Sequence, residues 1–560
     1  MTLPKDMLVN GVQQVVLNRL QRLPASARPL LNLPASIGRQ VDLKLIRILD
    51  HTTNFEEWLT ICSNAAVLDV QDQIWRFAHD RIRDSILSTL TNGQSLSLHL
   101  QVAMGLETAY AESVEEYAAR IADHYEAANL PASALPWCIR AARHAEDTYA
   151  PTIAIIYYRK ALALWKYSDN PPSIEMQVGK IYEQLGELLN GTSQYADALE
   201  LFREMSHIAE QVADKRMQAQ AWRGIARAQT YQGDMLQALN SAALAKEFAH
   251  LADSPSLVAH ASWMQSWIHS RIGNLDTARK LAEKVLQLCQ TLGETSLLGN
   301  TYNLLGGVQV ASGDYRAAAG SLEQALEIFQ QQGDGLRAMT IVNNLGWLME
   351  LRGDYTLAST FYEEALSLAR KYGHRNAEIL YLSNLGGTQE MRGEYAFAEA
   401  TLLQVIEIAD DSKPWHLSET YKYLAQAYLG QGKVFEALSA AQRALHLGQM
   451  VHSQEYTAAA WRVLGLVAAK DWLGQITVPE KDYLPGKPYD TRACFNESLG
   501  ICDEGDLNSE KAKTLRIWAT YELEQGNIVD ADAMWAEARS IFLDMGADKE
   551  VGYMDAYPLM

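Results

Sequence analysis

The residue types and spacings in this sequence favour ligand binding over catalysis. Arg223 and Arg227 are four residues apart, so they share one face of the helix that the surrounding pattern predicts, and together they could receive a carboxylate or a phosphate. Asn303 and Asn343 recur 40 residues apart in the same local pattern. An asparagine amide offers the donor and the acceptor that an extended peptide backbone requires. These side chains are therefore candidates for binding a peptide.

Motifs that carry catalysis or metal binding are missing from the sequence. It contains no Gly-x-x-x-x-Gly-Lys-Ser/Thr, His-Glu-x-x-His, Gly-x-Ser-x-Gly, Gly-x-Gly-x-x-Gly or EF-hand loop. The 13 histidines are dispersed. The five cysteines are scattered through apolar helical pattern and predict buried, reduced thiols: Cys62, Cys138, Cys289, Cys494 and Cys502. We expect a protein that is not an enzyme, with no catalytic residues, metal or cofactor.

Composition predicts an ordered helical chain with an acidic surface. Of the 560 residues 48% are hydrophobic, with only 15 prolines, and the formal net charge is −20. Residues 1–100 hold ten Lys and Arg against nine Asp and Glu, so the negative excess lies on the rest of the chain. Such a balance makes nucleic acid an unlikely partner, because phosphate backbones require clustered basic residues. No apolar run long enough to span a membrane and no signal-peptide pattern occurs, so we expect a cytoplasmic protein without a membrane partner.

A repeat of 40 residues sets the organisation of the chain. Asn303-Leu-Leu-Gly306 leads to Gly313-Asp-Tyr315, and the pattern returns at Asn343-Asn-Leu-Gly346 and at Ser383-Asn-Leu-Gly386. A fixed period of this size indicates a solenoid built from one supersecondary unit. The small residue of each unit falls at Gly186, Ala226, Ser266, Gly306, Gly346, Gly386, Ala425, Gly465 and Ala519. Because antiparallel helices approach closely only where a side chain is small, the register predicts packed helical hairpins.

This pattern resembles the tetratricopeptide repeat in its longer form, over about Ile174 to Ala547. The resemblance implies an all-α, right-handed superhelix in which the first helix of each hairpin lines a concave groove for a protein or peptide ligand. Long-form repeats often use asparagines of that helix to hold a peptide backbone, and Asn344 and Asn384 match the position. By this resemblance the groove presents Arg223, Arg227, Trp263, Trp267, Asn303, Asn343, Asn344, Trp347, Asn384, Lys422 and Gln426.

The N-terminal hundred residues follow a different pattern. Short helices are predicted at 41–49 and 55–62, strands at 66–70 and 74–77, and a further helix at 80–90. Helix, helix, hairpin, helix is the outline of a winged helix. The helix before the hairpin begins Phe55-Glu-Glu-Trp58, which is acidic, so DNA binding is not expected.

The stretch Phe77-Ala-His79-Asp80-Arg-Ile-Arg-Asp84 resembles the winged-helix signature of the STAND class of signalling ATPases. In that class the histidine touches the β-phosphate of ADP held by a P-loop domain, so the resemblance implies that His79 senses a nucleotide. The sequence has no P-loop, however. Two interpretations remain open for His79: it caps the following helix, or it senses a nucleotide held by a P-loop ATPase domain on another chain.

The sequence therefore predicts a non-catalytic, protein- or peptide-binding sensor scaffold of a signalling or transcription-regulatory system. The alternative is the sensor half of a split or truncated STAND ATPase that acts with a P-loop domain on another chain. The predicted domains are a helical segment with a winged-helix-like domain (1–100), bridging helices (101–173), the repeat array (174–547) with an insertion at 471–489, and a C-terminal tail (548–560).

Overall fold

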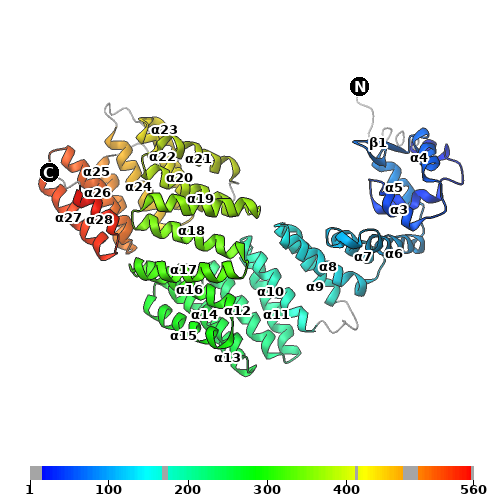
Figure 1. The fold of residues 1–560 in the computed structure, drawn as a ribbon, viewed down its shortest axis with the longest axis horizontal. Coiled ribbons are helices and arrows are strands. Elements are labelled where there is room, and N and C mark those ends of the chain that lie inside the picture. The colour runs from blue at the N-terminus through cyan, green and yellow to red at the C-terminus, as the bar shows by residue number, and fades with distance from the viewer. Residues whose placement is uncertain (1–15, 167–174, 410–413, 471–489, 557–560) are drawn as a thin grey trace. The chain divides into compact units, whose positions relative to one another are not determined.

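The computed structural model describes residues 16–166, 175–409, 414–470 and 490–556, and these residues form helices and one β-hairpin (Figure 1). The predicted insertion at 471–489 and the first 15 residues lie outside the described residues. Two compact units divide the chain, Met1–Ser241 and Ala242–Met560. Among the described residues, no helix is both long and apolar enough to cross a membrane.

The first unit begins with the helices and the hairpin that the sequence predicts. In chain order the elements are η1 (Pro29–Leu31), α2 (Asn32–Ile37), α3 (Leu43–Leu49), α4 (Phe55–Asn64), β1 (Leu68–Gln71), β2 (Ile74–Phe77) and α5 (Asp80–Ser88). The strands are antiparallel, with Leu68 opposite Phe77 and Gln71 opposite Ile74. Asp72 and Gln73 form the turn with φ of 52° and 64°, the left-handed conformation that a tight hairpin requires. The order of elements is as predicted, and the winged-helix assignment stays a prediction.

Helix α6 (Asn92–Ala109) follows this hairpin domain and begins before the bridging helices predicted for 101–173. It packs on α2 and α3. Gly105 allows the close approach, because a Cβ there would lie 2.8 Å from side-chain atoms of Leu45 and Leu49. The remaining elements of the first unit are η2 (Ala111–Tyr117), α7 (Ala118–Ala127), α8 (Pro131–Asp147), α9 (Pro151–Lys166), α10 (Glu175–Gly191), α11 (Tyr195–Gln211), α12 (Lys215–Gln232) and the start of α13 (Met235–Leu251).

The second unit is a regular array of helical hairpins. Its elements after α13 are α14 (Pro255–Ile272), α15 (Leu275–Leu292), α16 (Thr295–Ala311), α17 (Tyr315–Gln331), α18 (Gly335–Leu351), α19 (Tyr355–Lys371), α20 (Arg375–Met391), α21 (Tyr395–Ile408), α22 (Pro414–Gly430), α23 (Val434–Met450), α24 (Gln454–Ala469), α25 (Thr491–Glu504), α26 (Asn508–Glu524), α27 (Ile528–Asp544) and α28 (Asp548–Ala556). Each helix packs on the next, and α20 with α22, α22 with α24 and α24 with α26 also pack together. These even-numbered helices therefore form a continuous layer.

The small-residue register is explained by close helix packing within each hairpin. A Cβ at Gly306 would lie 2.9 Å from Leu322, and a Cβ at Gly346 would lie 2.8 Å from the ring of Tyr362. Both partners are fully or almost fully buried. The turn glycine Gly353 has φ of 78°, which L side chains rarely adopt. The predicted register of small residues is confirmed, and these residues allow the two helices of a hairpin to pack closely.

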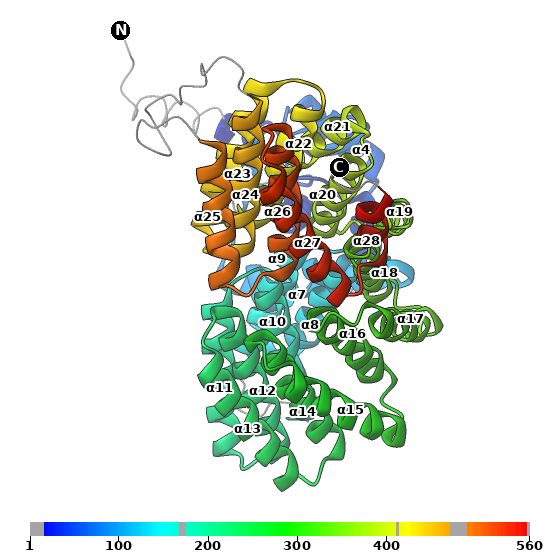
Figure 2. The same cartoon turned by 90° about the vertical axis from the view of Figure 1, so that its left-hand side faces the viewer.

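The C-terminal residues differ from the tail that the sequence predicts, because 548–556 form α28. This helix packs against the turn between α18 and α19, where Lys549 N donates to Arg352 O at 3.2 Å. The carboxylate of Glu550 accepts from the Tyr355 hydroxyl and pairs with Arg516. In Figure 2 α28 lies beside α18 and α19. Helix α28, the last described helix of the array, thus contacts the turn between α18 and α19, which lie earlier in the same array.

Candidate functional site

A cavity of about 790 Å³ lies inside the second unit, within the range of about 300–1,000 Å³ that is usual for ligand pockets. Helices α18, α20, α22, α24 and α26 contribute most of its wall, and the ends of α16 and α27 complete it. The lining is mixed, with apolar residues such as Leu351 and Leu380. Its polar and aromatic members include Asn343, Asn344, Trp347, Glu350, Asn384, Glu419, Lys422, Tyr423, Glu455, Glu510 and Lys513.

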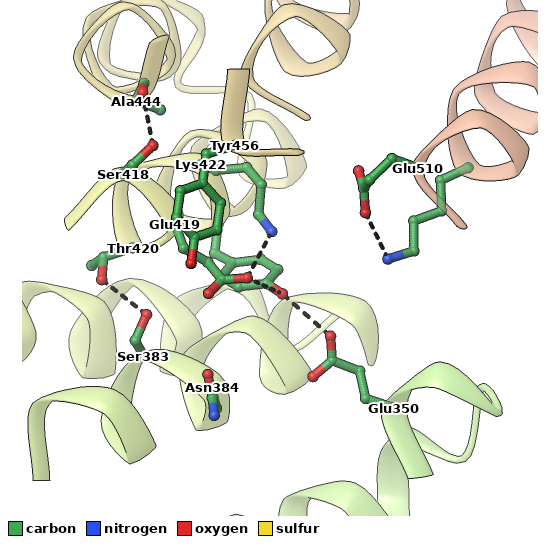
Figure 3. A network of polar contacts seen from close by, with 12 residues as sticks. Glu350, Ser383, Asn384, Ser418, Glu419, Thr420, Lys422, Ala444, Tyr456 and Glu510 are labelled. Atoms are coloured by element: carbon green, nitrogen blue, oxygen red, sulfur yellow. Dashed lines mark hydrogen bonds and ion pairs between the residues drawn. The ribbon is translucent and has the colours of Figure 1, made fainter. Parts of the chain in front are cut away.

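Acidic and basic side chains of α22 and α26, two helices far apart in the sequence, line this cavity (Figure 3). Lys422 Nζ lies 3.3 Å from Glu419 and 3.7 Å from the centre of the Tyr423 ring. Lys513 Nζ lies 3.0 Å from Glu510, which also pairs with the buried Arg462. Each of these three cations therefore already has a carboxylate partner.

The electrostatics of Glu510 and Lys513 follow from this pairing. Burial alone would raise the pKa of Glu510, but Arg462, Lys513 and Lys422 outweigh it and hold the pKa well below its usual range. Burial would lower the pKa of Lys513, and Glu510 raises it above its usual value instead. Both groups are therefore charged at neutral pH.

Glu350 is held differently, by neutral donors. The Tyr362 hydroxyl donates to it at 3.0 Å, and the Tyr423 hydroxyl lies 3.3 Å from it and 3.4 Å from Glu419, so these two carboxylates share its single proton. No ion pair to Glu350 occurs among the described residues. Burial raises the pKa of Glu350. Burial likewise raises the pKa of Glu390 to about 7, and Oε2 of Glu390 is buried without a hydrogen-bond partner. Glu350, which lines the cavity, and Glu390, which is not part of its lining, are therefore two carboxyl groups without a direct ion pair among the described residues.

The predicted asparagines form a ladder along the same helices. Asn344 Nδ2 donates to Asn303 Oδ1 at 2.9 Å, and Asn384 Nδ2 donates to Asn343 Oδ1 at 2.9 Å. Within α18, Asn343 Nδ2 lies 3.4 Å from Asn344 Oδ1. Asn343, Asn344 and Asn384 also line the cavity. The ladder joins successive repeats and places polar amides at the cavity wall.

The other predicted residues of the second unit divide between the cavity and packing. Trp347, which is 42% exposed, and Lys422 line the cavity. Trp263 and Trp267 stack on each other with ring centres 6.1 Å apart, and Trp263 packs against a small buried cluster around Val285. Gln426 is partly buried, and its Oε1 has no hydrogen-bond partner.

The predicted arginine pair lies in the first unit and is paired internally. Arg223 lies 2.5 Å from Glu183, and Arg227 pairs with Glu187. Each glutamate is 40 positions earlier, at the equivalent place of the preceding repeat. A ligand carboxylate or phosphate would have to compete with these glutamates, and its binding here stays a prediction.

His79 caps α5, as one of its two interpretations predicts. Its Nδ1 accepts from Arg81 N at 3.1 Å, and the neighbouring Asp80 lies 3.3 Å from Arg39. Capping satisfies a backbone amide that the helix leaves without a partner. Nucleotide sensing by His79 stays a prediction.

The cavity also contains charged residues that the sequence did not single out: Glu419, Glu455, Glu510 and Lys513, with Arg462 behind them. One signal was available for Arg462. It lies three residues before Gly465, as Lys422 lies three before Ala425 and Asn343 three before Gly346. Glu510 and Lys513 had no such signal, because the sequence insertion at 471–489 interrupts the register before them. No cluster of three or more metal-binding side chains occurs in the described part of the chain.

Comparison with known proteins identifies the repeats. The family model described as Tetratricopeptide repeat matches residues 268–331 and 337–411. No curated protein matches the chain in sequence.

Solved structures of similar fold include a Rap protein complexed with Competence and Sporulation Factor, at 12% identity over 66% of this chain and 99% of that one, with a TM-score of 0.49. The apo quorum sensor NprR from B. thuringiensis has 14% identity over 66% of this chain and 99% of that one, with a TM-score of 0.46. A STAND protein with a tetratricopeptide repeat sensor from Pyrococcus horikoshii has 16% identity over 78% of this chain and 67% of that one, with a TM-score of 0.34. Residues 268–331 and 337–411 of this all-α chain are therefore tetratricopeptide repeats.

Proposed function

We propose that this chain is a peptide-binding sensor scaffold and that the cavity of its second unit is the binding site. The observation that carries the proposal is the polar wall of that cavity, where the amides of Asn343, Asn344 and Asn384 stand beside Glu350 and Lys422. A purely structural core of this volume would be filled with apolar side chains, because buried polar groups are costly unless they are paired.

A peptide suits this wall because its backbone offers donors and acceptors at regular intervals. The asparagine ladder repeats along successive helices, so its amides recur in a row. Each amide carries a donor and an acceptor and can serve either side of a peptide unit. The exposed face of Trp347 adds an apolar contact for a side chain of the ligand.

Equilibrium affinity selection on the full chain tests this function. A pool of random heptapeptides is incubated with the protein, and the retained peptides are measured by mass spectrometry. We expect the double variant Asn344→Leu, Asn384→Leu to retain at least about tenfold less peptide, because two hydrogen-bonding amides are lost from the wall. Asn496→Leu, an exposed substitution on α25, is the matched control and should retain as much as the unchanged protein. Equal retention by the double variant would contradict the proposed site.

A further inference from the structure

The charges that line the cavity do not balance. The wall carries Glu350, Glu419, Glu455 and Glu510, but only Lys422 and Lys513 with positive charge. Asp506 and Asp544, both exposed, add two carboxylates at the ends of the neighbouring helices. A concave wall with an excess of one sign concentrates ligands of the opposite sign.

The cations of the site make their direct ion pairs with carboxylates other than Glu350. Lys422 lies beside Glu419, and Lys513 and Arg462 lie beside Glu510, so these groups compensate one another. Glu350 is left with two tyrosine hydroxyls and no ion pair among the described residues. Within that part of the chain Glu350 therefore makes no direct ion pair, although Lys513 and Lys422 act on it electrostatically, and it differs from Glu455 of the same wall in being held by hydroxyl donors.

The surroundings of Glu350 fix the carboxylate in place. Tyr362 and Tyr423 are almost fully buried. The Tyr362 hydroxyl donates to Oε2, and the Tyr423 hydroxyl, which Glu419 shares, lies against Oε1. Figure 3 shows Glu350 reaching from α18 toward the groups that α22 presents. A carboxylate oriented in this way needs little rearrangement to accept a further donor.

A second acceptor nearby also lacks a donor. Glu390 has a buried Oε2 without a partner, and both Glu350 and Lys422 act on it electrostatically. Burial raises the pKa of Glu350 and of Glu390, so each group has a stronger preference for its neutral form than it would have in water. A bound cation would reverse that preference.

We propose that the ligand is a peptide carrying a positively charged group, an ammonium or a guanidinium, that pairs with Glu350 inside the cavity. This inference rests on the proposed function and names the class of peptide that the site selects. The basic group supplies the direct ion pair that Glu350 does not make among the described residues, and the rest of the peptide lies along the asparagine ladder.

Three synthetic heptapeptide pools test the inference on the full chain. All are random in uncharged residues at the other positions. The first is N-acetylated with a fixed central arginine, the second is N-acetylated with citrulline there, and the third has citrulline and a free N-terminus. Citrulline keeps the shape of arginine without its charge, so the comparison isolates the charge. We expect at least about tenfold higher retention of one or both charged pools than of the neutral pool.

Glu350→Gln should remove this preference while retaining the neutral pool, because glutamine keeps the size of the side chain. Glu363→Gln, an exposed substitution on α19, should leave the preference unchanged. If Glu350→Gln does not fold, the retention of the charged pools relative to the neutral pool on the unchanged protein still tests the inference. Equal retention of all three pools would overturn this inference and leave peptide binding standing. Retention of none would overturn the proposed function as well.

Discussion

The protonation of Glu390 depends directly on the electrostatics of the second unit. It is partly buried on α20, its Oε2 lacks a hydrogen-bond partner, and Lys422, Arg462 and Glu350 are the charged groups that act on it. Burial raises its pKa from 4.5 to about 7, and the two cations oppose that rise without cancelling it. The folded protein therefore binds a proton at Glu390 more tightly than the unfolded chain does.

This difference makes stability depend on pH. Since the folded pKa is the higher one, the contribution of Glu390 is fully present below about pH 4.5 and is lost as pH rises to about 7. Glu390→Gln keeps a neutral side chain at every pH. We expect its free energy of unfolding, relative to the unchanged protein, to rise by roughly 1–3 kcal/mol between pH 4 and pH 8.

Urea denaturation at several pH values measures this difference. Glu363→Gln provides the control, because the exposed Glu363 should add no comparable pH dependence. If the free energies of unfolding of Glu390→Gln and of the unchanged protein differ by the same amount at every pH, folding does not raise the pKa of Glu390.

At the scale of elements, the register of small residues explains how each hairpin packs. Gly346 faces the ring of Tyr362, which is fully buried and whose hydroxyl donates to Glu350. Gly320, on α17, has no atom within 4 Å of the position that a Cβ would take. Alanine at Gly320 therefore changes helix propensity alone, whereas alanine at Gly346 also changes the packing against Tyr362.

We expect opposite effects of alanine at these two positions. Gly346→Ala should lower the free energy of unfolding by about 1–3 kcal/mol, because Tyr362 has no room to move away. Gly320→Ala should raise it by about 0.5–1 kcal/mol, since alanine favours the helix and meets no neighbour. Chemical denaturation of both variants checks the pair. A stabilising Gly346→Ala would contradict the packing explanation.

The C-terminal helix α28 is held to the turn between α18 and α19 by one buried carboxylate. Glu550 accepts from Tyr355 and pairs with Arg516, and Lys549 lies 3.5 Å from Asp354. Glu550→Ala would leave Arg516 and the Tyr355 hydroxyl without this partner.

The free energy of local opening at this contact should fall by roughly 2–4 kcal/mol in Glu550→Ala. Hydrogen exchange should then accelerate in residues 348–356 and 548–556, and should be unchanged in α14 and α15. Glu524→Ala, an exposed change on α26, is the control. Unchanged exchange at 348–356 would mean that Glu550 does not hold α28 in place.

For the whole molecule, the repeats were predictable because their register is local. Small residues recur at a fixed spacing, and the glycines among them pack against a side chain of the other helix of the same hairpin. The asparagines at the cavity wall follow the same register and were predicted with it. The packing of helix α6 on α2 and α3 was not predicted, because it depends on a tertiary contact at Gly105.

The charged part of the cavity could not be predicted in the same way. Glu510 and Lys513 come after the insertion at 471–489, and they meet Arg462 only because α26 packs on α24. The contact of α28 with Arg352 joins residues almost 200 positions apart. Such contacts depend on the curvature of the array, which a spacing pattern does not encode.

Hydrogen exchange of the full chain, with and without a peptide retained in the affinity selection, tests the central claim most directly. The amides measured are those of the segments that line the cavity, 343–351, 419–423 and 506–513. The account predicts slower exchange in these segments when the peptide is bound. Protection confined to the helix that carries Arg223 and Arg227, or no protection at all, would contradict it.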